Sequence, residues 1–191
     1  TVYRDPGDGK LLFRTHLKGE IMMVSDDYVA DVTLYKKSSD MASGNDMYYY
    51  TIEEARDNGL LEQRLNLIGK TLTGSETYTE LFQFAVETGL LVPVVKTKSN
   101  DRASGKNGLY EITPEQILDA FNGNANEVPG TYMVVVSAKG YLDYVEDNIV
   151  LTLTGAEAQY QFITTLISAG DVNGDGIIDD NDYRMFDELS K

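Results

Sequence analysis

The sequence has no cysteine and no tryptophan, and its 191 residues include one histidine, His16. Without cysteine the chain forms no disulfide and offers no thiolate as a nucleophile or a metal ligand. A single histidine excludes zinc sites built from several imidazoles. A Ser-His-Asp triad would have to use His16, and no Gly-x-Ser-x-Gly motif accompanies it. These absences predict a protein that is not an enzyme.

Positive charge is also scarce. The chain has 16 basic and 31 acidic residues, which gives a formal net charge of −15, and the acidic residues are spread along its length. A surface of this kind repels nucleic acid and anionic lipid and attracts cations. No apolar run approaches the ~20 residues that span a bilayer. We therefore expect no nucleic-acid partner and no insertion into a membrane.

Residues 171–182, near the C-terminus, have the spacing of a calcium-binding loop. Side-chain oxygens fall at loop positions one, three, five and twelve, and a glycine falls at position six, where such a loop turns with positive φ. Position seven offers a backbone carbonyl, and the acid at position nine can hold a ligating water. Oxygen ligands in this number suit a hard cation, for which Ca²⁺ is the default. The predicted ligands are Asp171, Asn173, Asp175, Ile177, Asp179 and Asp182.

The segments on either side of this loop differ in character. Residues 183–191 place Tyr183 and Phe186 at helical spacing, which predicts a short amphipathic helix. Residues 159–167 are rich in β-branched and aromatic side chains, which predicts a strand. The alternative for the loop itself is an acidic turn without a bound ion.

The segment 170–182 resembles the first repeat of a type I dockerin, the calcium-dependent module that binds cohesins in cellulosome-type assemblies. Dockerins have two such repeats, whereas this sequence shows one, and Asp180 and Asn181 stand where type I dockerins often carry Ser-Thr. The resemblance implies a bound Ca²⁺ and a cohesin or another surface protein as the partner. It also implies a bacterial protein that is secreted or held at the cell surface.

The rest of the chain predicts a body rich in β-strands. Alternating or β-branched runs indicate strands at 17–24, 29–36, 48–52, 90–96, 108–112, 131–137, 139–144 and 148–154. Pro93 indicates an edge strand or a bulge. The run 131–137 is apolar enough to be buried on both faces. Strands at this short spacing favour an antiparallel β-sandwich.

Helix signals are fewer. Thr113, Pro114 and Gln116 have the chemistry of an N-cap, a first turn and a capping box, so residues 113–121 predict a helix. Residues 53–67 fit a helix loosely, because Asn58-Gly59 interrupts the pattern. Residues 80–87 fit either a helix or a strand, and we favour the strand.

Residues 108–112, 128–142 and 148–152 resemble the carboxypeptidase regulatory-like, or prealbumin-like, β-sandwich, which has an Ig-like arrangement of strands. The resemblance implies a sandwich module at 1–168, with helical insertions near 37–107 and 113–127. A partial dockerin, the calcium loop and its helix, would follow at 169–191. This combination resembles the X module-dockerin tail of cellulosomal proteins.

Together, these patterns predict a non-catalytic extracellular module that supports protein–protein assembly in polysaccharide degradation. Two alternatives stay open. A carbohydrate-binding or adhesion module would present exposed rings to a polysaccharide, and residues 48–50 supply three consecutive tyrosines. A fragment of a glycoside hydrolase would place two carboxylates about 5–10 Å apart in a cleft. Asp26-Asp27 is a candidate for a second cation, although a solvated turn is favoured.

Overall fold

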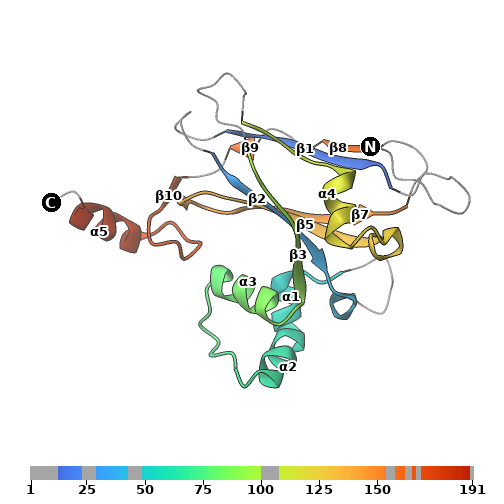
Figure 1. Cartoon of the computed structure of the whole chain (residues 1–191). Helices are drawn as coiled ribbons and strands as arrows, with labels where there is room; N and C mark the ends of the chain where they lie inside the picture. Colours follow the sequence, from blue (N-terminus) through green and yellow to red (C-terminus); the bar gives the residue numbers. More distant parts are fainter. Residues whose placement is uncertain are drawn as a thin grey trace, which may run out of the picture.

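In the computed structural model two four-stranded β-sheets are stacked face to face, and a layer of helices covers the outer face of one of them (Figure 1). None of the helices in the described part of the chain is long and apolar enough to cross a membrane. The structure describes residues 13–22, 29–42, 49–99, 108–153, 158–161, 165–166 and 169–189.

The central sheet is antiparallel throughout, with the strand order β3-β2-β5-β7. Pro93 lies in the edge strand β3, where the register with β2 shifts, so the predicted edge position and bulge are both confirmed. These strands are β2 (Asp31–Lys37), β3 (Leu91–Lys98), β5 (Gly130–Ser137) and β7 (Tyr144–Leu151).

Strand β5 is buried on both faces, as the sequence predicts. Successive side chains of a strand point to opposite faces, so Tyr132, Val134 and Val136 enter the core between the two sheets. Met133 and Val135 enter a second core beneath the helices. One strand therefore belongs to both apolar clusters.

The second sheet contains the one departure from antiparallel pairing among the described strands. Its central strand β1 pairs antiparallel with β4, but parallel with β8 and β9. The expected antiparallel sandwich is therefore correct for most of the fold and wrong here, because alternation identifies a strand without fixing the direction of a distant partner. The strands are β1 (Thr15–Met22), β4 (Leu109–Ile112), β8 (Ala158–Gln161) and β9 (Thr165–Leu166).

Helix α4 (Pro114–Ala120) packs Ile117 and Leu118 into the core between the sheets. The Thr113 hydroxyl accepts the Gln116 N–H, and the Gln116 side chain accepts the Thr113 N–H. The predicted capping box is thus confirmed. A short 3₁₀ helix, η2 (Ala125–Glu127), leads from α4 toward β5.

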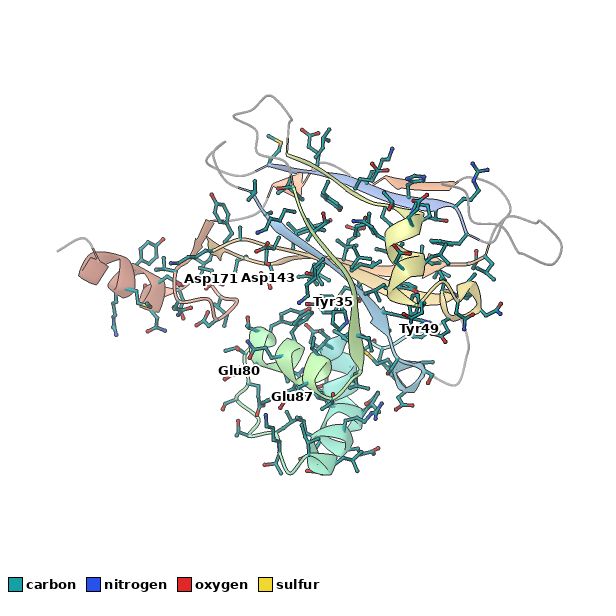
Figure 2. All side chains as sticks on the ribbon, in the orientation of Figure 1. Tyr35, Tyr49, Glu80, Glu87, Asp143 and Asp171 are labelled. Atoms are coloured by element: carbon teal, nitrogen blue, oxygen red, sulfur yellow. The ribbon has the colours of Figure 1, made fainter. Side chains whose placement is uncertain are left out.

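The helical layer packs against the central sheet. Two segments that were expected to be strands are found in or next to this layer instead. The strand expected at 80–87 is wrong, because the Thr77–Glu80 capping box starts a helix there. Its Leu81 and Ala85, four residues apart, are buried. Figure 2 shows Tyr35 pointing from β2 toward this layer, where its ring meets Phe82 edge-on at 5.1 Å. The layer contains η1 (Ser39–Met41), α1 (Ile52–Asp57), α2 (Leu60–Leu67) and α3 (Tyr78–Glu87).

The strand expected at 48–52 is also wrong. Tyr49 makes one isolated bridge to Ala42, and the Thr51–Glu54 capping box then starts α1. The weak helical pattern at 53–67 becomes two helices, which meet at Gly59 with φ of +82°. Tyr48 and the Asp26-Asp27 pair lie outside the described residues.

Shortening a side chain in the core between the sheets tests this packing. Leu34 is fully buried, so Leu34→Ala should lower the free energy of unfolding by about 2–5 kcal/mol in urea denaturation. Val92 lies on edge strand β3 with 46% of its surface exposed, and Val92→Ala should change that free energy by no more than about 0.5 kcal/mol. Equal effects of the two substitutions would contradict the assigned core.

Candidate metal centre

The predicted calcium loop leaves a short strand and enters a helix. Strand β10 (Ala169–Asp171) pairs antiparallel with β6 (Gly140–Tyr141), which attaches the start of the loop to the body. Helix α5 (Asp180–Leu189) begins at loop position ten and extends away from the sheets (Figure 1). The two acids at the ends of the loop are buried: Asp171 is 4% exposed and Asp182 is 2% exposed.

The carboxylate of Asp171 accepts three backbone hydrogen bonds from its own loop. Oδ1 accepts the N–H groups of Gly174 at 2.9 Å and Asp175 at 3.1 Å, and Oδ2 accepts that of Gly176 at 3.0 Å. Gly176, at position six, has φ of +85°, the sharp turn that the sequence predicts. The left-handed backbone there directs successive N–H groups inward toward the carboxylate.

Asp182 holds the two ends of the loop together. Its Oδ1 accepts the Val172 N–H at 2.7 Å and the Asn173 N–H at 3.2 Å, while Oδ2 accepts the Asp179 N–H at 2.8 Å. These bonds hold the pKa of Asp182 below its ordinary value, and the bond from the Asp179 N–H has the largest effect. The first turn of α5 is therefore fixed to residues that follow β10.

The remaining predicted ligands make shorter-range bonds. Asn173 Oδ1 accepts the Asp175 N–H at 2.8 Å, Asp175 Oδ1 accepts the Ile177 N–H at 2.9 Å, and Asp179 Oδ1 accepts the Asn181 N–H at 2.8 Å. Asn173 Nδ2 also donates to Asp175 Oδ2 at 2.9 Å. The Ile177 side chain is 49% exposed and has no donor atom, so its backbone carbonyl is the candidate ligand at position seven.

The oxygen chemistry of the loop suits a hard cation such as Ca²⁺, because carboxylate, amide and backbone oxygens are all available. However, no group of three or more acidic, histidine or cysteine side chains converges on a metal position among the residues that the structure describes. The carboxylates of Asp171 and Asp182 hold loop N–H groups instead. Calcium binding therefore stays a prediction.

A pocket of about 380 Å³ is lined by residues of both the loop and the body, and one of them is an acid that the sequence patterns do not indicate. Asp31, Asp143 and Asp171 line it, together with Lys139. Figure 2 shows Asp143 beside Asp171. The pKa of Asp143 is raised, mainly because surrounding protein displaces water from its carboxyl and also because Asp171 is close. No motif marks Asp143, which lies two residues after β6, the strand that pairs with β10.

His16 and the tyrosines have structural surroundings. His16 Nδ1 lies 2.8 Å from Glu111 Oε1, across the β1–β4 pair. Tyr49 and Tyr50 are half-buried and pack against the core beneath the helices, so they do not form an exposed row of rings. Neither feature forms a second candidate site besides the C-terminal loop.

Comparison with known proteins gives little beyond this geometry. No protein-family model matches the chain, and no curated protein matches it. The chain is similar to a chain from a mutant type II cohesin–X-dockerin complex of Acetivibrio cellulolyticus, at 15% identity and a TM-score of 0.34. The similarity covers 86% of this chain and 64% of that chain, which is less than two thirds of the neighbour. A TM-score this low supports no conclusion about fold, activity or partner.

Acidification should release the loop through Asp182. Its pKa in the folded chain lies below the ordinary value of about 3.9, so its stabilisation of the loop is complete above that value. It is lost as the pH falls through the lower native pKa. In an NMR titration without metal, the amide signals of Val172 and Asp179 should shift over that range. Asp180→Asn, at an exposed position, should leave this transition in place, and Asp182→Asn should abolish it. Amide signals that do not respond to acid would contradict the assigned bonds.

Proposed function

We propose that residues 171–182 bind one Ca²⁺ ion, and that the bound ion orders the C-terminal segment of a non-catalytic assembly module. The observation that supports this most is the closure of the loop by its two end residues. The buried Asp171 and Asp182 stand at positions one and twelve, and Asp182 Oδ1 receives the N–H of Val172 at 2.7 Å. The residues with the required oxygens are therefore gathered in one short, closed loop.

The negative charge of the loop gives the ion a physical role. Asp171, Asp175 and Asp182 are acids within twelve residues, and they repel one another when ionised. Ca²⁺ would offset that repulsion and take oxygen ligands from these residues and from Asn173, the Ile177 carbonyl and, through water, Asp179. An ion that binds the folded loop but not the unfolded chain stabilises the folded form by mass action.

In this proposal the partner binds the surface beside the loop. Tyr183 is 69% exposed and Met185 is 40% exposed on α5, and Ile177 and Ile178 are exposed in the loop. Exposed apolar side chains are candidates for contact with a protein partner. In this proposal a cohesin or another surface protein covers them once Ca²⁺ has fixed the loop. The setting would be the bacterial cell surface or the secreted fraction, in polysaccharide degradation.

A calorimetric titration with Ca²⁺ tests the site. One binding event is expected for the wild-type chain. Asp175→Asn removes one ligand charge but keeps an oxygen that can accept the Ile177 N–H, so it should weaken binding at least tenfold. Asp180→Asn removes the same charge from the adjacent helix start and should change the affinity by less than about threefold. Absence of binding to the wild-type chain at millimolar Ca²⁺ would contradict the proposal.

Capture of the chain on immobilised cohesins tests the partner separately. Capture should require Ca²⁺ and be reversed by a chelator, because the ion fixes the loop and α5. Tyr183→Ala should reduce capture without affecting the calcium titration, since Tyr183 is exposed and its side chain lies outside the predicted ligand set. Capture that is unchanged by chelation would show that partner binding does not depend on the calcium site, and would contradict this part of the proposal.

The absence of catalysis stays a prediction. Assays on polysaccharides and on chromogenic glycosides test it, and turnover that is lost on substituting Asp143 would favour the glycoside hydrolase alternative. Slowed migration in gels that contain polysaccharide would favour a carbohydrate-binding module. The packing of Tyr49 and Tyr50 does not support that alternative.

A further inference from the structure

Strand β2 ends in a buried lysine. The Lys37 side chain is fully removed from solvent, which is rare for a lysine unless specific groups surround its amine. Alternation along β2 places Lys37 on the same face as Tyr35, toward the helical layer. Its neighbour Lys36 is on the opposite face, with its amine 5.2 Å from the ring centre of Phe121. The burial of Lys37 therefore follows from its place in the strand.

Three oxygen groups surround the Lys37 amine. Nζ lies 2.8 Å from Asp147 Oδ1, 3.3 Å from Asn148 Oδ1 and 3.2 Å from the backbone oxygen of Tyr50. Asp147 and Asn148 belong to β7, which is separated from β2 by β5 in the sheet. The lysine side chain thus reaches across one strand to contact two consecutive residues of another.

Contact with two consecutive residues requires an irregular strand. In a regular strand Asp147 and Asn148 would point to opposite faces, and only one of them could reach the amine. The register between β5 and β7 shifts at this point, and Asn148 has φ of +56°, in the left-handed region. A bulge of this kind redirects side chains, and bulges are frequent beside reactive sites. Here it brings a carboxylate and a carboxamide to one buried amine.

We propose that Lys37 and Asn148 become joined by an amide bond within the folded chain. The Lys37 ammonium gives a proton to Asp147, and the neutral amine attacks the side-chain carbonyl carbon of Asn148. A bond forms from Lys37 Nζ to Asn148 Cγ, and the bond from Cγ to Nδ2 breaks. Asp147 returns its proton to the departing nitrogen, then takes a second proton from the attacking nitrogen and passes it to the ammonia, which leaves as ammonium. The ammonium and the carboxamide thus become a secondary amide and an ammonium ion, without an oxidant, a reductant or a cofactor.

The geometry assigns a different part to each of the three groups. Asp147 is the acid–base group, because its carboxylate makes the shorter contact to the amine. Asn148 is the acyl donor, and the Tyr50 carbonyl positions the amine. If Lys37 condensed with Asp147 instead, no acid–base group would be left for the reaction, because no second carboxylate pairs with this amine in the described part of the chain.

Such a bond would connect β2 to β7 covalently across β5. The cysteine-free chain can form no disulfide, and a side-chain amide would provide a cross-link that does not depend on redox conditions. It would restrict the unfolded chain between residues 37 and 148, as a disulfide does.

Intact-mass spectrometry of the full chain, after prolonged incubation of the folded protein, tests this inference. The expected mass is about 17 Da below the value calculated from the sequence, because one ammonia is lost. Trypsin should then fail to cut after Lys37 and should release a branched peptide that joins residues 37–56 to residues 140–184. Fragmentation of that peptide locates the linked residues.

Three variants serve as controls. Lys37→Arg keeps the positive charge but forms no such amide, and Asn148→Gly removes the acyl group at a positive φ that glycine tolerates. Both should have the full mass calculated from their sequences. Asp147→Asn removes the acid–base group and should leave the chain uncrosslinked. A wild-type mass equal to the calculated value would overturn the proposal, as would a loss of about 18 Da with a link to Asp147 instead.

Discussion

The burial of β5 on both faces is the constraint on which the arrangement of this chain depends. Tyr132, Val134 and Val136 close the core between the sheets, while Met133 and Val135 close the core under the helices. The chain then turns through β6, and β10 pairs with that short strand before the acidic loop begins. The position of the C-terminal loop is thus connected through one short turn to β5, a strand buried on both faces.

Acidic residues have two different roles in this molecule. They give the chain a formal net charge of −15. Asp171 and Asp182 are instead buried and are satisfied by N–H groups of their own loop. Asp147 is paired with a lysine that has no access to solvent. The chemical proposals concern these buried or partly buried acids, because partial removal from water strengthens their interactions with an ion or an amine.

The one capping motif that was used in the sequence analysis predicted its helix correctly. Thr113, Pro114 and Gln116 gave the start of α4 correctly. The same capping pattern, Thr-x-x-Glu, precedes α1 and α3. It would have fixed the start of α1 in a segment that fits a helix only loosely, and it would have identified α3 where a strand was favoured. The apolar run at 80–87 fits both a helical and a strand period, so hydrophobic spacing alone did not decide between helix and strand there.

Features that depend on contacts between distant segments could not be predicted from the sequence. The parallel pairing of β1 with β8 joins segments more than 140 residues apart, and neither segment indicates its direction. Asp143 and Lys37 carry no motif, since their surroundings come from other strands. The loop at 171–182 could be recognised because its spacing specifies local backbone geometry, including the positive φ of Gly176. Its metal is a matter for solution experiments.

A Ca²⁺ titration followed by two-dimensional NMR of the isotope-labelled chain measures the central claim most directly. The account predicts that the amide signals of Gly174 and Gly176, which bond to Asp171, shift and saturate at one equivalent of Ca²⁺ while those of β5 stay in place. Loop signals that do not move at millimolar Ca²⁺ would contradict it.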